Sequence, residues 1–305
     1  MRDAFVRALG ELAADDPSVV LVTGDLGFGV LNDYRARFPG QFVNAGVAEQ
    51  NMTALACGMA LEGARAYTYS IANFPTLRCL EQLRNDVCHH GAAVTVVAVG
   101  GGFSYGPLGM SHFATEDLAI MRAIPGMTVV APSDPWMAGE LTRQLHRAGK
   151  PAYLRIDKGQ AGLPPEPVEL GKVRRVREGG DGVIFAIGGI LSEAVAAAAE
   201  LETQGLSVTV VDVHTLKPFD TAGVRAAAER QSVVVTVEEH TVVGGLGSAV
   251  AEALLEGGIA PRAFRRIGLA DRFPEVVGDQ AYLRAAFGLD RHAVVAAFHE
   301  ALAPC

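Results

Sequence analysis

The sequence has few of the features that mark secreted, membrane-spanning or nucleic-acid-binding proteins. Its four cysteines include no C-x-x-C pair and are too sparse for a disulfide scaffold, so we expect a reduced, cytoplasmic setting. The N-terminus has no basic segment followed by an apolar run, so a signal peptide is not expected. The longest apolar stretches, such as Val94 to Val99, are too short to cross a bilayer. The net charge is −8, with 34 acidic against 26 basic residues, which argues against a nucleic-acid partner.

The chain does have a regular alternation of short β-rich runs and helix-length amphipathic segments. This alternation is typical of parallel sheets covered by helices on both faces. We therefore predict an α/β fold of two doubly wound domains. Residues 160–167 contain three prolines and one glycine and show no apolar periodicity, which indicates a boundary. The expected division is a mainly parallel-sheet domain at 1–160, a linker at 161–178 and a smaller domain at 179–305.

Buried strands are expected where near-continuous apolar runs end at Gly, Pro or Asp. In the first domain these runs are 19–22, 94–99 and 128–131, and in the second they are 183–187, 206–213 and 232–237. Helices are expected at 48–61 and 76–87, and a further helix capped by Ser192 is expected to end at Gln204.

Two short motifs have an ordinary structural interpretation beside a functional one. Gly244 to Ser248 follows a strand and opens a helix, so its N–H groups could hold a phosphate, although most such glycine turns serve packing. The pair His89-His90 is expected at a solvated helix end, because adjacent helical residues point in different directions.

Glu49 lies at the start of the predicted helix at 48–61. The ordinary interpretation is a first-turn acid that complements the helix dipole. Its neighbours Val47, Ala48 and Met52 are apolar, however, and this suggests that the helix start is buried in an interface. A buried carboxyl group can hold a proton at neutral pH, so proton transfer is the functional hypothesis.

His112 closes a glycine-rich loop that follows the predicted strand 94–99. Five of the ten residues from Gly100 to Gly109 are glycine, which suggests a backbone shaped around another group. Ligands of open parallel sheets bind at the carboxyl ends of the strands. His112 is therefore a candidate site residue, and a solvent-facing loop histidine is the alternative.

The segment Gly46-Val-Ala-Glu49-Gln-Asn-Met52 resembles the pyrimidine-binding domain of thiamine diphosphate enzymes of the transketolase superfamily. That superfamily includes deoxyxylulose phosphate synthase and the β subunits of pyruvate dehydrogenase E1. Further matching motifs occur in the same order at 23–26, 69–74, 111–112, 116–127, 131–134, 214–220 and 236–248. The resemblance covers essentially the whole chain and implies that its second domain is of the transketolase C-terminal type.

The resemblance also implies that another chain supplies part of the site. A full transketolase begins with a diphosphate-binding domain that carries a G-D-G…N motif for Mg²⁺, whereas this sequence starts at the pyrimidine-binding domain. Gly180-Asp181-Gly182 resembles the start of that motif, but every Asn lies at or before Asn85, so none can complete it. The sequence looks like the C-terminal half of a split transketolase with no metal site of its own. The implied cofactor is thiamine diphosphate, with Mg²⁺ held mainly by a separate N-terminal subunit in an α2β2 assembly.

The matching motifs assign roles to three residues. By this resemblance, Glu49 activates the cofactor through a hydrogen bond to the aminopyrimidine ring. His112 matches the histidine that hydrogen-bonds oxygens of the donor sugar and assists proton transfer. Asp25 matches an acid that lines the cofactor pocket.

Four further residues complete the site implied by the resemblance. Phe74 matches one of two aromatic residues beside the pyrimidine ring, and Ile71 occupies the position of the other. Arg2 and Lys158 align more loosely with basic residues that hold a sugar phosphate, and both could equally be surface charges.

Departures from the family pattern leave the donor open. Leu108 stands where transketolases have an acid that reads a donor hydroxyl, and Gly100 replaces a further histidine. The resemblance favours a transferase, inactive without its partner, that moves a two-carbon ketol unit between sugars or sugar phosphates. The apolar Leu108 and Met110 support an alternative in which pyruvate is the donor and an acyl unit is passed on. A non-enzymatic binding role of the fold is the third hypothesis.

Overall fold

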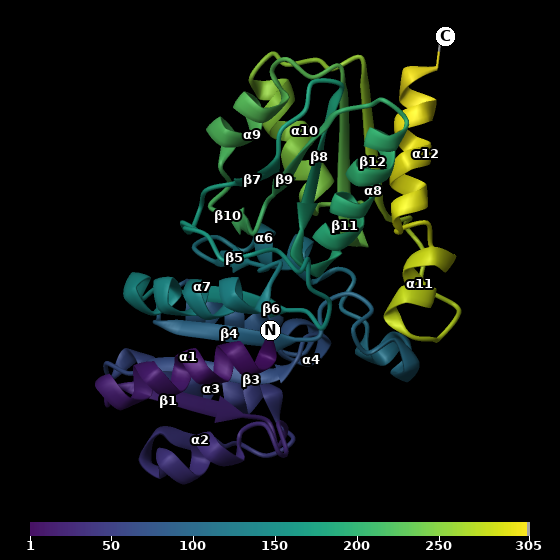
Figure 1. Ribbon diagram of the computed structural model, residues 1–305. Helices are drawn as coiled ribbons and strands as arrows, with labels where there is room; N and C mark the ends of the chain where they lie inside the picture. The colour runs from purple at the N-terminus through teal and green to yellow at the C-terminus, as the bar shows by residue number, and fades with distance from the viewer. Residues whose placement is uncertain (304–305) are drawn as a thin grey trace.

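The computed structural model describes residues 1–303, which form two α/β units, one above the other in Figure 1. The strands of the first unit are β1 (Val19–Thr23), β2 (Phe42–Asn44), β3 (Arg65–Ile71), β4 (Val94–Val99), β5 (Thr128–Val130) and β6 (Ala152–Ile156). The strands that follow along the chain are β7 (Arg174–Arg177), β8 (Gly182–Ile187), β9 (Val208–Asp212), β10 (Thr215–Lys217), β11 (Val233–Thr241) and β12 (Ala263–Leu269).

Both sheets are mainly parallel. The first sheet has the order β10-β5-β6-β4-β3-β1-β2 and the second has the order β12-β11-β8-β9-β7. Only the edge strands β10 and β7 are antiparallel, to β5 and β9 respectively; the remaining pairings are parallel. The prediction of an α/β fold with parallel sheets is confirmed.

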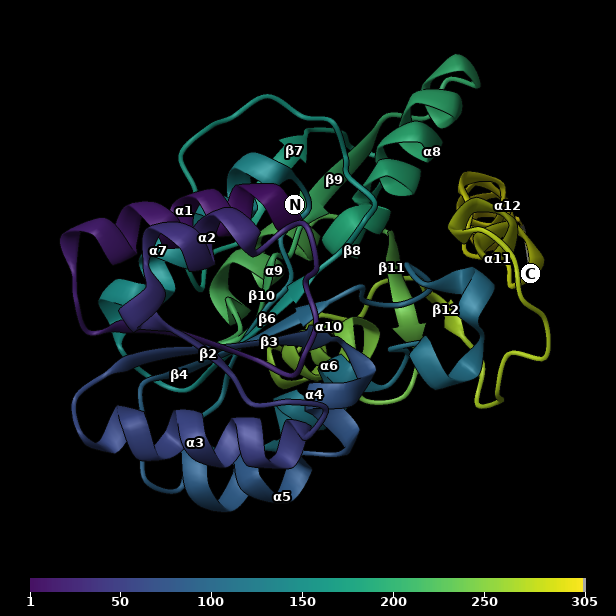
Figure 2. The same ribbon diagram turned by 90° about the horizontal axis from the view of Figure 1, so that it is seen from below.

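Helices cover both faces of the first sheet (Figure 2). One face packs against α1 (Arg2–Asp15) and α7 (Pro135–Ala148), with α2 (Asn32–Arg37) beside them. The other carries α3 (Glu49–Leu61), α4 (Asn73–Leu77), α5 (Leu80–Gln82), a π-helical turn at Leu83–Cys88, and α6 (Asp117–Ala123). Neighbouring strand residues point to opposite faces, so Leu21 packs in the cluster with α1 and Val22 in the cluster with α3.

The second sheet is also covered on both faces. On one face lie α8 (Leu191–Thr203) and α12 (Arg291–Leu302), and on the other α9 (Thr221–Ala228) and α10 (Leu246–Glu256); α11 (Gln280–Ala286) follows β12. Short 3₁₀ turns occupy Pro39–Gln41, Gly106–Leu108, Met110–His112 and Gly188–Ile190. One apolar cluster contains both Val96 of the first sheet and Phe185 of the second, so the two units share part of their core. Within the described residues, no helix combines the length and the apolar character that crossing a bilayer requires.

The structure corrects three details of the sequence analysis. The range 161–178 expected to be a linker contains β7, which its four residues Arg-Arg-Val-Arg did not suggest because they lack apolar alternation. The single helix expected at 76–87 is divided among α4, α5 and the π-helical turn. Ser192 does not cap α8, because the helix begins one residue earlier and the Ser192 hydroxyl donates to the carbonyl of Gly189 at 3.0 Å.

A buried histidine lies where β10 crosses from the second unit to the edge of the first sheet. His214 precedes β10, and its carbonyl accepts a hydrogen bond of 2.8 Å from the N–H of Ala131, just after β5. Burial, with a smaller contribution from the positive charge of Arg174, lowers the pKa of His214 from 6.5 to about 4. The imidazole is therefore neutral in the folded protein at neutral and mildly acidic pH.

We expect His214 to weaken the folded state as the pH falls. Between the unfolded pKa of 6.5 and the folded pKa of about 4, only the unfolded chain binds a proton here, so the free energy of unfolding rises with pH. Between pH 7 and pH 5, the free energy of unfolding of the wild type should fall by about 2 kcal/mol more than that of His214→Gln. Urea unfolding across this range measures the difference. The exposed His292→Gln should keep the wild-type dependence, and an equal dependence in wild type and H214Q contradicts the prediction.

Candidate functional site

The predicted site residues come from loops at one edge of the first sheet. Strands β1, β3 and β4 are parallel neighbours, so their carboxyl ends at Thr23, Ile71 and Val99 meet at the same edge. Asp25 follows β1, Glu49 begins α3 after β2, and Phe74 lies in α4 directly after β3. His112 ends the loop that follows β4. This convergence is the usual origin of ligand sites in open parallel sheets.

Glu49 is buried at the first position of α3. Its side chain is 5% exposed, and one carboxylate oxygen, Oε2, accepts a hydrogen bond of 2.9 Å from Nη1 of Arg78. Among residues 1–303, Arg78 is the one group whose side chain donates to this carboxylate. Gly24 lies alongside, because a Cβ placed there would be 3.6 Å from Cγ of Glu49. Glu49 is thus buried within this chain, whereas 77% of Val47 is exposed, and the expectation that an interface covers the helix start stays a prediction.

Arg78 joins Glu49 to the aromatic part of the site. Its guanidinium carbon lies 4.2 Å from the centre of the Phe74 ring, a cation–π distance. The ring of His112 meets Phe74 edge to face, with their centres 5.2 Å apart. Glu49, Phe74 and His112 therefore belong to one continuous group of contacts.

The same group extends to Lys158 through Tyr105. The centre of the Tyr105 ring is 6.4 Å from that of His112, and Nζ of Lys158 lies 4.1 Å from the Tyr105 centre. Burial, then the positive charge of Arg2, lowers the pKa of Lys158. Arg2, whose side chain is 47% exposed and pairs with Asp3, thus lies close enough to Lys158 for their charges to interact.

Asp25 and Ile71 lie at the rim of the site. Asp25 is half-buried and has a φ of +57°, and its Oδ1 accepts a bond of 2.8 Å from Nδ2 of Asn44. Asn44 in turn accepts from the N–H groups of Asp25 and Gly46, which ties the loop after β1 to the segment that leads into Glu49. Ile71 is half-buried at the end of β3.

The sequence analysis missed Arg78, Asn44 and Tyr105. Arg78 and Phe74 are four residues apart in a helical segment, a spacing that places two side chains on one face, and this signal could have found the pair. Tyr105 and Asn44 carried no comparable local signal, because the contacts of Tyr105 with Lys158 and of Asn44 with Asp25 join segments that are separate in the sequence.

Glycines of the loop at 100–109 make room for other parts of the protein, with Gly102 and Gly106 lying against the second unit. A Cβ on Gly102 would lie 2.4 Å from Oε1 of Glu239, and one on Gly106 would lie 2.2 Å from the carbonyl oxygen of Gly278. Both approaches are closer than any side chain tolerates. Gly100 and Gly101 are packed in the same way against Tyr105 and Arg155 of the first unit, so the glycine-rich backbone is shaped around the protein itself, which corrects the interpretation that it wraps a bound group.

The other short motifs have structural roles. The N–H groups of Leu246 and Gly247 donate to the buried carboxylate of Glu238, so in the turn at Gly244 to Ser248 these groups bind an internal acid in place of a phosphate. Asp181 accepts from the N–H of Ser207 in a turn before β8. His89 and His90 are exposed. No group of three or more His, Cys, Asp or Glu residues with a metal-binding arrangement occurs within residues 1–303.

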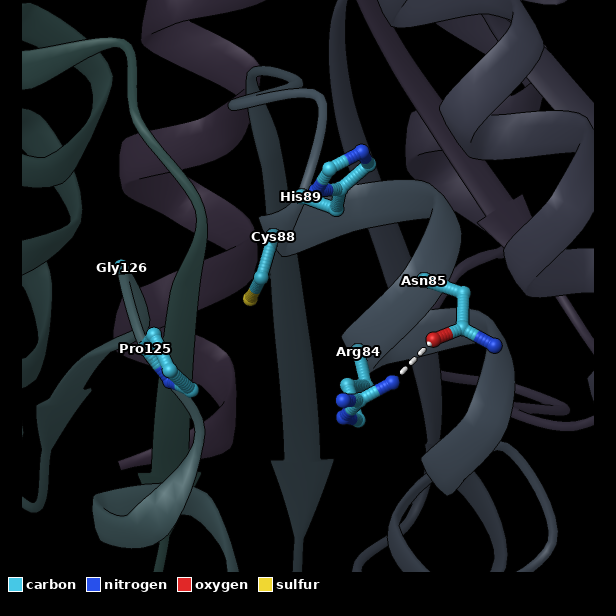
Figure 3. Close-up of a pocket in the computed structure, with 6 residues that line it drawn as sticks. All are labelled: Arg84, Asn85, Cys88, His89, Pro125 and Gly126. Carbon is cyan, nitrogen blue, oxygen red and sulfur yellow. Dashed lines mark hydrogen bonds between the residues drawn. The ribbon is translucent and has the colours of Figure 1, made fainter.

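A cavity of about 620 Å³ lies away from this site (Figure 3). It is lined by Arg84, Asn85, Cys88, His89, Pro125 and Gly126. Residue 88 precedes β4 and residue 126 precedes β5, so the cavity lies at the amino ends of these strands. The candidate residues lie at the opposite edge of the sheet, and none of them lines this cavity.

Comparison with known families assigns each of the two units to a domain family. The transketolase pyrimidine-binding domain matches residues 1–163, and the transketolase C-terminal domain matches residues 171–294. The chain belongs to the transketolase family. It is thus an enzyme subunit of the transferase class, in a family whose members depend on thiamine diphosphate.

Its relatives include subunits of split enzymes. The 6-deoxy-6-sulfo-D-fructose transketolase subunit SqwH of Clostridium sp. (strain MSTE9) is 38% identical over 304 residues, covering 98% of this chain and 94% of that protein. An apulose-4-phosphate transketolase subunit of Phocaeicola vulgatus is 35% identical, covering 96% and 94%. A solved split-gene transketolase, described as an inactive β4 tetramer, superposes with a TM-score of 0.88 at 34% identity, covering 99% and 97%.

We expect Arg78 to stabilise the fold through Glu49. In Arg78→Met the buried carboxylate loses its charged donor, and the free energy of unfolding should fall by about 1–2 kcal/mol. Thermal or urea unfolding measures the effect. Arg84→Met is the matched control, because Arg84 is exposed and bonds the side chain of its neighbour Asn85. Equal stability of the two variants would show that the Arg78–Glu49 pair contributes nothing to the free energy of unfolding.

Proposed function

We propose that this chain is the pyrimidine-binding subunit of a two-chain, thiamine diphosphate-dependent transketolase that transfers a two-carbon ketol unit between sugars or sugar phosphates. The observation that carries the proposal is the buried Glu49 carboxyl group. Arg78 occupies one of its oxygens and holds the side chain at the start of α3, which leaves the other oxygen to bond a ring nitrogen of the cofactor.

The residues around Glu49 suit an aminopyrimidine ring. Phe74 supplies an aromatic surface, Ile71 an aliphatic one and Asp25 a second acid at the rim. When bound, thiamine diphosphate supplies the electron sink that C–C bond cleavage requires. Glu49 would hold the proton shared with the ring, and its burial keeps water from competing for that bond.

One wall of the site is not formed by the residues that the structure describes. Phe28, in the loop after Asp25, and Val47, just before Glu49, are 78% and 77% exposed, although large apolar side chains at a small-molecule site are normally covered. We assign the missing wall to a separate subunit that carries the diphosphate-binding domain and most of the Mg²⁺ ligands. An α2β2 assembly is the simplest symmetric form.

His112, Lys158 and Arg2 are assigned to the substrate. His112 projects from the loop after β4 beside Phe74, so a donor held over the ring would lie within reach of its imidazole. Arg2 and Lys158 lie beyond Tyr105 and form a cationic end suited to the phosphate of a sugar phosphate.

A second candidate function follows from two apolar side chains beside His112. Leu108 and Met110 are 55% and 51% exposed on the same loop. They would favour a donor with a methyl group in place of hydroxyl groups, such as pyruvate, which would be decarboxylated before an acyl unit is transferred.

Glu49→Gln tests the cofactor role. The amide keeps the size of the side chain and an oxygen for Arg78 but cannot give up a proton as a carboxyl group does. Ketol transfer by the reconstituted complex should fall by about 10²-fold or more while thiamine diphosphate still binds. Steady-state kinetics and cofactor titration measure the two effects.

The matched control for E49Q is Glu81→Gln, an exposed glutamate of α5. It should retain wild-type activity. If E49Q also retains full activity in a complex that binds the cofactor, the assignment of Glu49 is wrong.

The donor can be identified directly. The complex of this chain with its partner subunit is incubated with a ketose phosphate and an aldose acceptor, and in parallel with carboxyl-labelled pyruvate. We expect ketol transfer without release of labelled CO₂. Release of CO₂ without ketol transfer would favour the second candidate function. If neither reaction is observed, both candidate functions are wrong.

A further inference from the structure

The loop that carries His112 is attached to the second unit at its base. It leaves β4 after Val99 and is closed by paired hydrogen bonds between Gly102 and Ala114, of 2.9 and 3.1 Å. Phe103, the residue after this closure, is fully buried and stacks on Phe287 of the second unit, with ring centres 5.5 Å apart. The rest of the loop carries Tyr105 and His112 to the candidate site.

Glu239 of β11 binds the loop at that base. Its Oε1 accepts the N–H of Phe103 at 2.6 Å and also a bond from Nε2 of Gln280 at 2.8 Å. Its Oε2 accepts from Nε of Arg284, in α11. Glu239 is 1% exposed, so both oxygens of a fully desolvated carboxylate are occupied.

Asp157 provides a second attachment through the same helix. It accepts the hydroxyl of Ser104 at 2.7 Å and Nε2 of Gln280 at 3.0 Å. Gln280 therefore bridges Asp157 of the first unit and Glu239 of the second. The backbone N–H of Lys158 lies 3.3 Å from the same Ser104 hydroxyl, so the segment that carries Lys158 is part of the arrangement.

We propose that Glu239 is a positioning residue for the candidate site: through the N–H of Phe103 it fixes the loop that places His112, so the second unit sets the geometry in which substrate is held. This inference rests on the proposed function of His112. Glu49 and Phe74 lie on α3 and α4, to which Glu239 makes no bond among the described residues. Cofactor binding and donor binding should therefore respond differently to a change at Glu239.

Glu239→Gln weakens this attachment with a minimal change in shape. A carboxylate has two acceptor oxygens, but an amide has one, so Gln at this position must lose either the Phe103 N–H or Arg284. Loss of the Phe103 N–H frees the loop directly, and loss of Arg284 removes the charged donor that holds the residue 239 side chain against the loop. A displacement of about 1 Å at a substrate-positioning group can cost up to about 10²-fold in rate. We expect kcat/KM for the donor to fall at least about tenfold with an increase in KM, while the Kd of thiamine diphosphate changes by less than about twofold.

The adjacent Glu238→Gln is the matched control. Glu238 is equally buried on β11, and its two oxygens accept the N–H groups of Leu246 at 2.7 Å and Gly247 at 2.8 Å. Its amide variant also loses one acceptor, but at the start of α10 and not at the loop. E238Q should therefore lower stability and leave the kinetic constants of the reconstituted complex at wild-type values.

Hydrogen exchange of the isolated chain tests the attachment without any activity. E239Q should increase exchange in peptides of 100–114 and leave 246–256 unchanged, whereas E238Q should do the reverse. Unchanged exchange at 100–114 in E239Q overturns the proposal, as do wild-type kinetic constants for E239Q or an equal kinetic loss in E238Q. If the complex proves to transfer no ketol unit, the proposed function fails, but the exchange result still decides whether Glu239 holds the loop.

Gln280→Ala is the second variant that tests the proposal if E239Q does not fold. It removes the bridge between Asp157 and Glu239 and leaves both carboxylates and Arg284 in place. The same effects, smaller in size, are expected on exchange at 100–114 and on KM for the donor. Wild-type behaviour of Q280A in both measurements would then overturn the proposal.

Discussion

A carboxylate removed from water must be paired with a charge or hydrogen-bonded, and the geometry of this protein around its candidate site depends on how two buried glutamates, Glu49 and Glu239, meet that requirement. Glu49 takes its bond from Arg78, which in turn covers Phe74. Glu239 takes bonds from a loop of the other unit. Glu238 takes the first N–H groups of α10. For Glu49 and Glu239 the need of one acid fixes the position of a segment remote in the sequence, whereas the partners of Glu238 lie only 8 and 9 positions away.

These contacts divide the site between the two units. The first unit supplies the candidate side chains at the carboxyl ends of its parallel strands. The second unit binds the loop after β4, which carries His112. Because an apolar cluster continues from Val96 to Phe185 and β10 pairs with β5, the units have a common core rather than a mobile junction. By the proposal for Glu239, the transketolase C-terminal domain helps to position the site, although no candidate side chain comes from it.

Local pattern was informative where the physical cause was local. The run Val94 to Val99 is a strand with the same limits as predicted, since a strand buried on both faces must be apolar throughout. Glu49 was placed at a buried helix start, and this is confirmed. Local pattern misled where packing decided: Gly102 and Gly106 of the loop make room for Glu239 and Gly278 rather than for a ligand.

The sequence alone determined the order and type of most elements, the family, and the set of residues that gather at one sheet edge. These features could be predicted because periodicity and ordered motifs are local properties of the sequence. The tertiary structure alone decided which groups satisfy the buried acids. Arg78 is 29 positions from Glu49, and Phe103 is 136 positions from Glu239. No periodicity of a helix or a strand spans such distances, so partners of this kind are specified by the packing of the whole molecule.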